Sequence, residues 1–581
     1  MVKRLSQCIR EYKKVSILTI VYIVFEVVLE CIIPFIIANL VNEMQKGCGL
    51  STIFERGIML VILACFSLLF GALAGSTSAT ASCGFAKNIR HDLFEQVQGF
   101  SFENIDCFSA SSLVTRLTTD VTNVQMAYMM MIRIAIRAPL MFLFAIIMAF
   151  IMGGKLAAIF VIVVPFLIFG LAMVIKSTMP LFRKVFKKYD ALNNSIQENV
   201  KAMRVVKSFV REDYEKEKFN TAAEDVCNDF TRAEKILAFN NPMMQCCLYI
   251  VMIFVLFFGS YMIITTKGAS VNVGQLSSML TYSFQILSSL MMISFVFVMI
   301  TMSIESAKRI VEVLEAESTI TNPLEPVMEV ADGSIDFEQV NFKYSKTASK
   351  MALSGIDLHI KSGETIGIIG GTGSSKSSLI QLISRLYDTT EGVVKVGGID
   401  VRNYDLETLR NQVAVVLQKN VLFSGTIKDN LRWGNIDATD EELEEACKLA
   451  QADEFIEKFP ERYDTYIEQG GANVSGGQKQ RLCIARALLK KPKILILDDS
   501  TSAVDTKTDA NIQKAFARFI PETTKLIIAQ RISSIQHADR IIVMEGGRIN
   551  GIGTHEELLK TNEIYKEVYT SQNKAGERNE E

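Results

Sequence analysis

Long apolar runs fill the first half of the chain, whereas the second half alternates apolar and polar positions over short stretches. A helix that crosses a membrane needs about 20 consecutive, mostly apolar residues. Runs of that length recur between residues 1 and 305, and they are too long and too many for the buried helices of a soluble protein. Six membrane-spanning helices are therefore predicted, over residues 15–40, 57–83, 134–153, 156–176, 237–265 and 276–303.

The basic residues predict how these helices are oriented, because Lys and Arg are enriched in loops on the cytoplasmic side. The stretch before the first run and residues 176–235 are rich in both, whereas the predicted turns near 41–56, 153–155 and 266–275 hold few. We therefore expect a multi-pass protein of the cell membrane with both chain ends in the cytoplasm. No cleavable signal peptide is apparent, because the first apolar run is too long and lacks a small-residue cleavage site.

Two long segments between the runs, residues 84–133 and 177–236, show the periodicity of helices. We expect the membrane helices to continue through both segments far into the cytoplasm. Residues Phe108–Thr119 and Arg204–Arg211 would then be placed to contact a soluble domain.

Residues from 331 onward have the composition of an ordinary soluble domain, so the 581-residue chain divides in two. The net charge of −2 implies no bulk affinity for nucleic acid. None of the eleven cysteines forms a CxxC pair, and neither an external disulfide nor a structural metal site is expected. The predicted boundaries are a membrane domain at 1–314, a linker at 315–332, a soluble domain at 333–570 and a polar tail at 571–581.

A glycine-rich loop follows a short buried strand at 366–370 and precedes a predicted helix at 377–386. Strand, loop and helix in this order are the context of a phosphate-binding loop. Backbone N–H groups and the helix N-terminus would face the phosphates, and the lysine would supply a positive charge to them. The loop comprises Gly370, Gly371, Thr372, Gly373, Ser374, Ser375, Lys376, Ser377 and Ser378.

A second buried strand, Ile494–Asp498, ends in a carboxylate and is followed at once by Asp499. Asp498 suits the positioning of Mg²⁺ together with the Ser377 hydroxyl. Asp499 stands where a general base would lie.

With these motifs and the segment Val474–Gln478, nearly the whole chain resembles the half-transporters of the bacterial ABC exporters. The resemblance implies six membrane helices with long cytoplasmic extensions fused to an α/β nucleotide-binding domain, with ATP and Mg²⁺ as cofactors. It also implies a second half-transporter, because each ATP lies between one chain's phosphate loop and the other chain's signature motif.

The resemblance assigns further residues by position. Tyr344 matches the aromatic residue that stacks on adenine, and Gln418 matches the glutamine that senses Mg²⁺ beside Ser377 and Asp498. The signature offered to the partner's ATP is Ser475, Gly476, Gly477 and Gln478, and the loop that links the two sites holds Ser502, Ala503 and Asp505.

Three positions depart from the family pattern. Asp499 replaces the usual Glu, which retracts the carboxylate by about 1.5 Å, and such a misplacement can cost about 100-fold in rate. Gln530 replaces the usual switch histidine and cannot carry its charge. Ser375 replaces a glycine of the phosphate loop.

These departures predict the degenerate-site subunit of a heterodimeric exporter, which lends its signature to the partner's active site. The alternatives are a homodimer with slow hydrolysis at both sites, or an ATP-gated channel or regulator. The substrates expected from the resemblance are amphipathic drugs, lipids or peptides.

Two carboxylates lie in the first membrane run, at Glu26 and Glu30, four residues apart on one helical face. Intramembrane carboxylates usually face a cavity or a partner, so both are candidates for a substrate or gating role. A structural ion pair is the alternative. Direct pairing with Arg133 or Arg137 is not expected, because these two arginines precede or begin the third run, near the inner surface.

Overall fold

The computed structural model of the chain describes residues 1–268, 271–345, 348–500 and 504–577. Its residues fall into two compact units. One comprises residues 1–98 and 110–316, and the other comprises residues 99–109 and 317–581. Each unit is described by itself below.

The described residues of the first unit form helices and their connections, without strands. Five of its helical stretches are long and apolar enough to cross a membrane, and the stretch at 110–182 contains both the third and the fourth predicted spans. These two spans are separated by a short 3₁₀ turn at Gly154–Ala158. The helices of this unit are α1 (Val2–Gln7), α2 (Lys13–Gln45), α3 (Leu50–Gln98), α5 (Ala110–Thr115), α6 (Val121–Gly153), α7 (Ile159–Lys201), α8 (Met203–Ser208), α9 (Glu212–Ala238), α10 (Asn240–Thr266) and α11 (Val273–Leu314).

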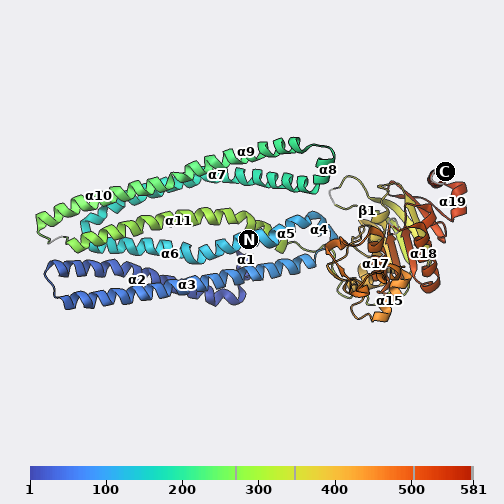
Figure 1. Cartoon of the computed structure of the whole chain (residues 1–581), viewed down its shortest axis with the longest axis horizontal. Helices are drawn as coiled ribbons and strands as arrows, with labels where there is room; N and C mark the ends of the chain where they lie inside the picture. Colours follow the sequence, from blue (N-terminus) through green and yellow to red (C-terminus); the bar gives the residue numbers. More distant parts are fainter. Residues whose placement is uncertain (269–270, 346–347, 501–503, 578–581) are drawn as a thin grey trace. The chain divides into compact units, whose positions relative to one another are not determined.

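The membrane helices extend well beyond a bilayer. Helices α3, α7 and α11 contain 49, 43 and 42 residues, and a rise of 1.5 Å per residue makes each about 60–75 Å long. The hydrocarbon core of a bilayer is only about 30 Å thick. In Figure 1, α7 and α9 lie side by side and the short helix α8 joins their ends. The predicted cytoplasmic extensions are therefore confirmed.

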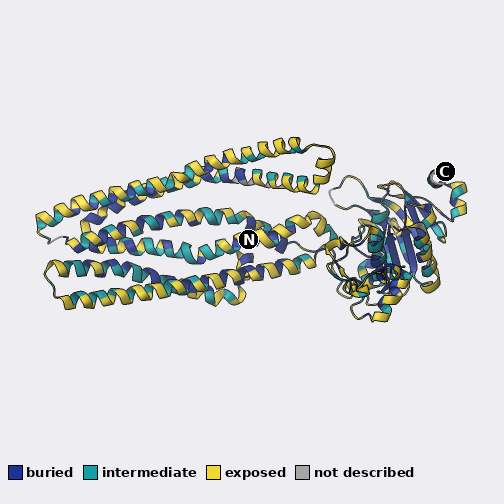
Figure 2. Cartoon of the chain, in the orientation of Figure 1, coloured by how far each residue is buried: buried dark blue, intermediate teal, exposed yellow. Residues whose placement is uncertain are grey.

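The outer faces of these helices are apolar yet exposed. In the most apolar 18-residue window of α3 only 6% of the residues are buried, and Figure 2 shows exposed positions along α3, α7 and α10. Exposure of such apolar surfaces to water would cost free energy, whereas lipid chains would solvate them. The exposure therefore agrees with membrane-spanning helices.

The second unit is built around two sheets. The larger has the strand order β12-β11-β3-β10-β9-β6, with parallel pairing from β11 to β6. All five residues of β9 are buried, as expected for a central parallel strand covered on both faces. The strands of this sheet are β3 (Thr365–Gly370), β6 (Val413–Val416), β9 (Ile494–Asp498), β10 (Thr524–Ile528), β11 (Arg540–Glu545) and β12 (Arg548–Gly553).

The smaller sheet is antiparallel and has the order β2-β1-β4-β5. Its strands are β1 (Ile335–Phe342), β2 (Leu353–Ile360), β4 (Glu391–Val396) and β5 (Ile399–Asp400), and β7 (Gly425–Thr426) pairs with β8 (Tyr466–Ile467) elsewhere. The helices of this unit are α4 (Phe102–Cys107), α12 (Lys376–Ile383), α13 (Leu406–Gln412), α14 (Ile427–Arg432), α15 (Asp440–Leu449), α16 (Asp453–Ile456), α17 (Gly476–Leu488), α18 (Thr506–Phe519), α19 (His555–Thr561) and α20 (Glu563–Glu577).

Helix α4 belongs to this second unit although it comes from the first 110 residues of the chain. The Tyr387 hydroxyl donates to Asp106 over 2.6 Å, and the Phe102 ring lies 6.0 Å from the Tyr387 ring. The chain thus leaves the helical unit after α3, forms α4 on the sheet-containing unit and returns at α5.

Candidate functional site

The glycine-rich loop lies between β3 and α12, as predicted. The Lys376 ammonium donates to the carbonyls of Gly370 and Gly371 over 2.8 and 3.0 Å. Burial lowers the pKa of Lys376, and the carboxylates of Asp498 and Asp499 oppose that effect. Helix α12 ends at Ile383, three residues earlier than the predicted end at 386, and Arg385 beyond it has a φ of +49°.

Ser375 occupies a backbone conformation that favours glycine. Its φ is +69°, in the left-handed region, immediately before α12 begins. A side chain in that region costs roughly 1–2 kcal/mol through the clash of Cβ with the backbone. The departure from glycine noted in the sequence therefore falls where it strains the loop.

Ser375→Gly is expected to stabilise the nucleotide unit by about 1 kcal/mol, because relief of the strain outweighs the greater freedom of glycine in the unfolded chain. The apparent melting temperature should rise by about 2–4 °C, measured by differential scanning fluorimetry. Ser354→Gly is the control, because Ser354 has no positive φ. This variant should lose stability. Equal losses in the two variants would contradict strain at Ser375.

Asp498 ends strand β9, two strands from the phosphate loop, and accepts a hydrogen bond from the Ser377 hydroxyl. Burial raises the pKa of Asp498, while Ser377 and Lys376 act in the opposite direction. Two neighbouring oxygen ligands beside the phosphate loop fit a hard cation such as Mg²⁺.

Asp499 is held by two amide side chains. The Gln530 Nε2 donates to its Oδ2 over 2.7 Å, and Gln418 forms a second hydrogen bond to the same carboxylate. Burial raises the pKa of Asp499, and both hydrogen bonds lower it. Asp499 also has a φ of +50°, so its backbone is strained at the point where the strand turns.

Tyr344 lies over the start of α12. Its hydroxyl is 2.7 Å from the Ser378 Oγ, and its ring packs edge-on against the Tyr387 ring at 5.2 Å. Tyr344 remains 43% exposed, so part of the residue is accessible to solvent. A base stacked on the Tyr344 ring would lie beside the phosphate loop.

The signature residues form the N-terminus of α17. The Ser475 hydroxyl accepts from the Gln478 N–H over 3.3 Å, and the Gln478 side chain accepts from the Ser475 N–H over 2.8 Å. This capping box fixes the helix start, and Ser475 and Gly476 are exposed. An anion could approach this helix N-terminus from outside the unit.

Asp505 is the N-cap of α18 and accepts from the Thr508 N–H over 2.9 Å. Asp505 was predicted to belong to the loop that links the two ATP sites. The other two residues predicted for that loop, Ser502 and Ala503, lie outside the described residues.

Comparisons with known proteins show the family of the chain. The family model of the ABC transporter transmembrane region matches residues 16–291, and that of the ABC transporter matches residues 353–502. The chain is 36% identical over 570 residues to the ABC transporter ATP-binding protein YfiB of Bacillus subtilis, covering 97% of each chain. The chain belongs to the ABC transporters, as an exporter half-transporter.

Two further likenesses concern the exporters directly. An ATP-dependent lipid A-core flippase of Desulfotalea psychrophila is 32% identical over 487 residues, which cover 84% of each chain. The fold matches a solved bacterial Atm1-family ABC exporter with ATP bound, with a TM-score of 0.83 over 97% of this chain and 98% of that one, at 22% identity. The chain is thus an ATP-hydrolysing exporter of the membrane with a cytoplasmic ATPase domain.

Gln572 is a residue of this ABC exporter's site that the sequence did not predict. Its side chain accepts from the Ile532 N–H over 2.9 Å and donates to the Gln530 carbonyl over 2.7 Å. Gln572 therefore holds the backbone of the switch loop, the segment that contains Gln530 and Ile532. Gln572 lies on helix α20, and this helix continues to Glu577 through the segment that was predicted to be a polar tail. No local pattern in the sequence indicates this contact.

The expectation that Glu26 and Glu30 do not pair with the nearby arginines is wrong. The Arg137 Nη2 lies 2.7 and 2.8 Å from the two Glu30 oxygens, and its Nε lies 3.5 Å from the Glu26 Oε1. Helix α6 begins at Val121, well before the apolar run, so Arg137 lies about four turns along it. Glu26 lies at a similar distance from the start of its own helix, about three and a half turns along α2. The side chains of Arg137 and Glu26 therefore meet.

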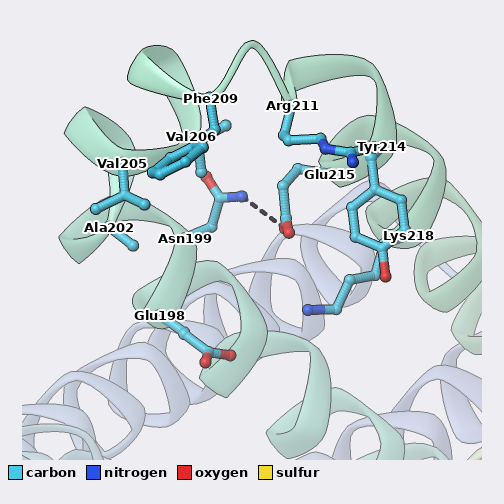
Figure 3. Close-up of a pocket in the computed structure, with 10 residues that line it drawn as sticks. All are labelled: Glu198, Asn199, Ala202, Val205, Val206, Phe209, Arg211, Tyr214, Glu215 and Lys218. Carbon is cyan, nitrogen blue, oxygen red and sulfur yellow. Dashed lines mark hydrogen bonds between the residues drawn. The ribbon is translucent and has the colours of Figure 1, made fainter.

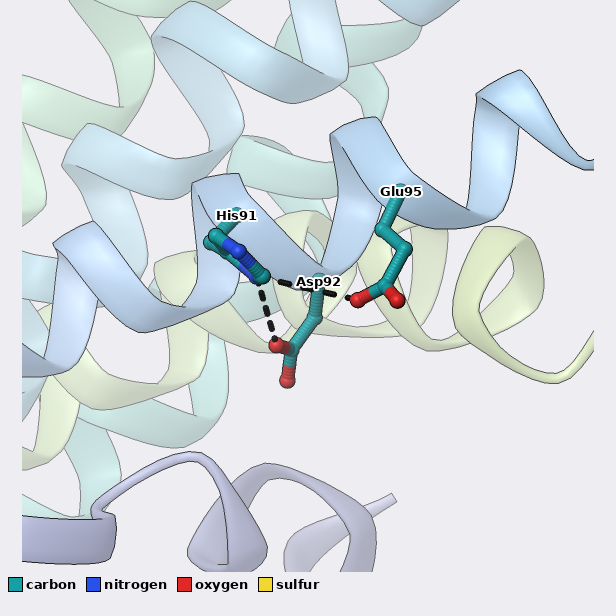
Figure 4. A group of neighbouring side chains, drawn as sticks. All are labelled: His91, Asp92 and Glu95. Carbon is teal, nitrogen blue, oxygen red and sulfur yellow. Dashed lines mark ion pairs between the residues drawn. The ribbon is translucent and has the colours of Figure 1, made fainter.

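A small cluster on α3 combines His91, Asp92 and Glu95 (Figure 4). The His91 Nδ1 lies 3.6 Å from Asp92 and 3.7 Å from Glu95. Arg10 already donates to the Asp92 carboxylate over 2.7 Å, and His91 is 67% exposed. A cation would have to displace Arg10, so we assign no metal to this group.

Proposed function

We propose that the chain is the degenerate-site subunit of a heterodimeric exporter of amphipathic molecules. It would bind ATP and Mg²⁺ at its own weakly hydrolytic site and offer Ser475–Gln478 to the active site of the second half-transporter. The hydrogen bonds of Asp499 to Gln530 and Gln418 are the observation on which the proposal chiefly depends. A carboxylate that already accepts from two amides is poorly placed to take a proton from water.

The cofactor assignment follows from the residues around the loop. Tyr344 would stack on adenine, the loop from Gly370 to Ser378 would cradle the phosphates, and Ser377, Gln418 and Asp498 would hold Mg²⁺. The bound metal would neutralise charge on the phosphates. To bind Mg²⁺, Gln418 would have to give up its hydrogen bond to Asp499. Binding of Mg²⁺ would thus change the surroundings of Asp499, the residue at the position of the general base.

The tip of the α7–α9 hairpin supports coupling to a nucleotide domain. A pocket of about 530 Å³ lies there, lined by apolar side chains from α8 such as Val205 and Val206 (Figure 3). Phe209 and Val210 are 73% and 80% exposed. An exposed apolar tip far from the membrane runs favours docking on another protein surface.

The nucleotide unit also exposes an apolar surface, formed by residues that follow Gln418 in the sequence. The rings of Phe423 and Trp433 stack at 4.2 Å, and Trp433 is 62% exposed. We infer that the α8 tip of one half-transporter docks on such a surface of a nucleotide domain. Closure of the two domains on ATP would then move the membrane helices.

The test compares the ATPase rate of this chain alone with the rate of the chain co-purified with a second half-transporter encoded in a neighbouring reading frame. In the complex, Asp499→Asn should change the rate by less than about twofold, whereas removal of the partner's general base should abolish it. The complex with Asp499→Asn and the complex without the partner's general base should both still bind ATP and retain it.

The homodimer alternative makes the opposite prediction. If the chain alone hydrolyses ATP rapidly and Asp499→Asn abolishes that activity, Asp499 is a working base and the heterodimer proposal fails. An ATP-gated channel would pass current in a planar bilayer without consuming ATP, which separates it from both exporter forms.

A further inference from the structure

A cavity of about 540 Å³ lies inside the membrane domain. Helices α2, α6 and α11 line it, and charged, polar and apolar side chains all reach its wall. Its lining comprises Glu26, Arg133, Ile134, Arg137, Ala138, Met141, Phe284, Gln285, Ser288, Ser289 and Met292. The mixture of charged groups and flexible thioethers on one wall is typical of a site for an amphipathic ligand.

Two glycines on α3 lie against the charged side chains, and a larger residue would be crowded at Gly71 but not at Gly75. A Cβ at Gly71 would lie 3.2 Å from the Glu26 Oε1, and a Cβ at Gly75 would lie 3.7 Å from the Arg133 Nη1. The two glycines are four residues apart and therefore share a face of α3. The Glu26 carboxylate and the Arg133 guanidinium thus reach the α3 backbone on neighbouring turns.

The charges around the cavity are unequally matched. Arg137 is paired with Glu30, and its Nε lies 3.5 Å from Glu26, so both carboxylates face the same arginine. Arg133 has no ion pair or hydrogen bond to any residue that the structure describes, and it interacts with Glu26 only electrostatically, through space. In addition, the Arg137 Nε and the Gln285 Oε1 are buried without hydrogen-bond partners.

A guanidinium without a direct partner is costly inside a membrane domain, and arginines there normally face a cavity where a counter-charge can reach them. A cationic ligand would compete with Arg137 for Glu26, and it would also meet the free charge of Arg133. An anionic group would supply the missing partner and could accept from the Arg137 Nε as well. The two carboxylates and the two guanidiniums cancel in formal charge, so the preference for an anion rests on the missing direct partner of Arg133.

We propose that this cavity binds an amphipathic molecule through a phosphate or carboxylate group that pairs with Arg133. The apolar part of the molecule would lie along Met141, Phe284 and Met292. This substrate class rests on the proposed export function. The ligand comes either from a bilayer phospholipid or from an anionic amphipath dissolved in the cytoplasm.

The test uses the full chain in a neutral maltoside detergent, without nucleotide and without a partner. Dodecyl phosphate is the probe, and dodecyltrimethylammonium is the matched cation of equal chain length. Binding is measured by isothermal titration calorimetry on the unmodified chain and on Arg133→Gln, Arg133→Lys and Arg232→Gln. Arg232 is an exposed arginine on α9 and is the control for loss of one surface charge.

We expect Arg133→Gln to weaken dodecyl phosphate binding about 10- to 100-fold, because a charge-assisted hydrogen bond is lost. Arg133→Lys should retain most of the affinity, and Arg232→Gln should change nothing. Glu26→Gln should strengthen binding of the anion, because Arg137 loses a competing carboxylate. Preserved binding by Lys also shows that a loss in the Gln variant is not misfolding.

The proposal is overturned if Arg133→Gln binds dodecyl phosphate as well as the unmodified chain, or if the cation binds more tightly than the anion. Native mass spectrometry distinguishes the two sources. Co-purified phospholipid that disappears in Arg133→Gln indicates a bilayer ligand, whereas probe binding without such lipid indicates a dissolved amphipath. Because binding needs neither ATP nor a partner, failure of the export proposal would leave this result unaffected.

Discussion

Ser475→Ala is expected to lower the ATPase rate of the assembled exporter by about 100-fold or more. The Ser475 hydroxyl and the exposed N-terminus of α17 would stabilise charge that develops on the γ-phosphate of the partner's ATP. Removal of a single preorganised donor of this kind typically costs 10²–10³ in rate. The measurement is the steady-state release of phosphate by the complex at saturating ATP.

The same substitution also removes a helix cap, which costs about 1 kcal/mol in stability. Thr439→Ala is the matched control, because Thr439 forms an equivalent capping box at the start of α15, with Glu442 as its partner. Both variants should lose similar stability, and only Ser475→Ala should lose activity. Equal ATPase rates in the two variants would remove Ser475 from the hydrolytic site.

Lys376→Ala should weaken ATP binding at this chain's own site by about 100-fold. Lys376 would donate charge-assisted hydrogen bonds to two phosphates, each worth about 1.5–3 kcal/mol. The chain's own carbonyls at Gly370 and Gly371 currently accept those bonds, so the ammonium is already turned toward the loop. The readout is photolabelling of this chain by 8-azido-ATP, with the two half-transporters separated by mass.

Lys560→Ala is the control for this experiment, since Lys560 is exposed on α19. Labelling of the second half-transporter should persist in both variants. If Lys376→Ala labels as strongly as Lys560→Ala, the glycine-rich loop is not the ATP site of this chain.

Local sequence patterns predicted much of this fold because the relevant physics is local. Apolar runs of about 20 residues mark the membrane helices, and a strand followed by glycines and a lysine marks the phosphate loop. The left-handed conformation at Ser375 follows the same logic, because the glycine it replaces is the residue that such a turn favours.

Contacts between distant segments were not predictable in this way. The pairing of Arg137 with Glu30 joins residues 107 positions apart, and it depends on where α6 begins relative to α2. Counting from the edge of an apolar run gave the wrong relative position of the two side chains, because α6 begins before the run does. Gln572 likewise reaches the switch loop across 40 residues of sequence.

The position of α4 has a practical consequence for recombinant work. A nucleotide domain expressed from residue 317 onward would lack Phe102 and Asp106, and would leave the Tyr387 ring and hydroxyl uncovered. Tyr387 also touches the Tyr344 ring, so the vacant surface adjoins the platform proposed for adenine. Nucleotide affinities measured on that fragment would therefore describe a truncated fold, and adding a synthetic peptide of residues 99–109 would restore the missing surface.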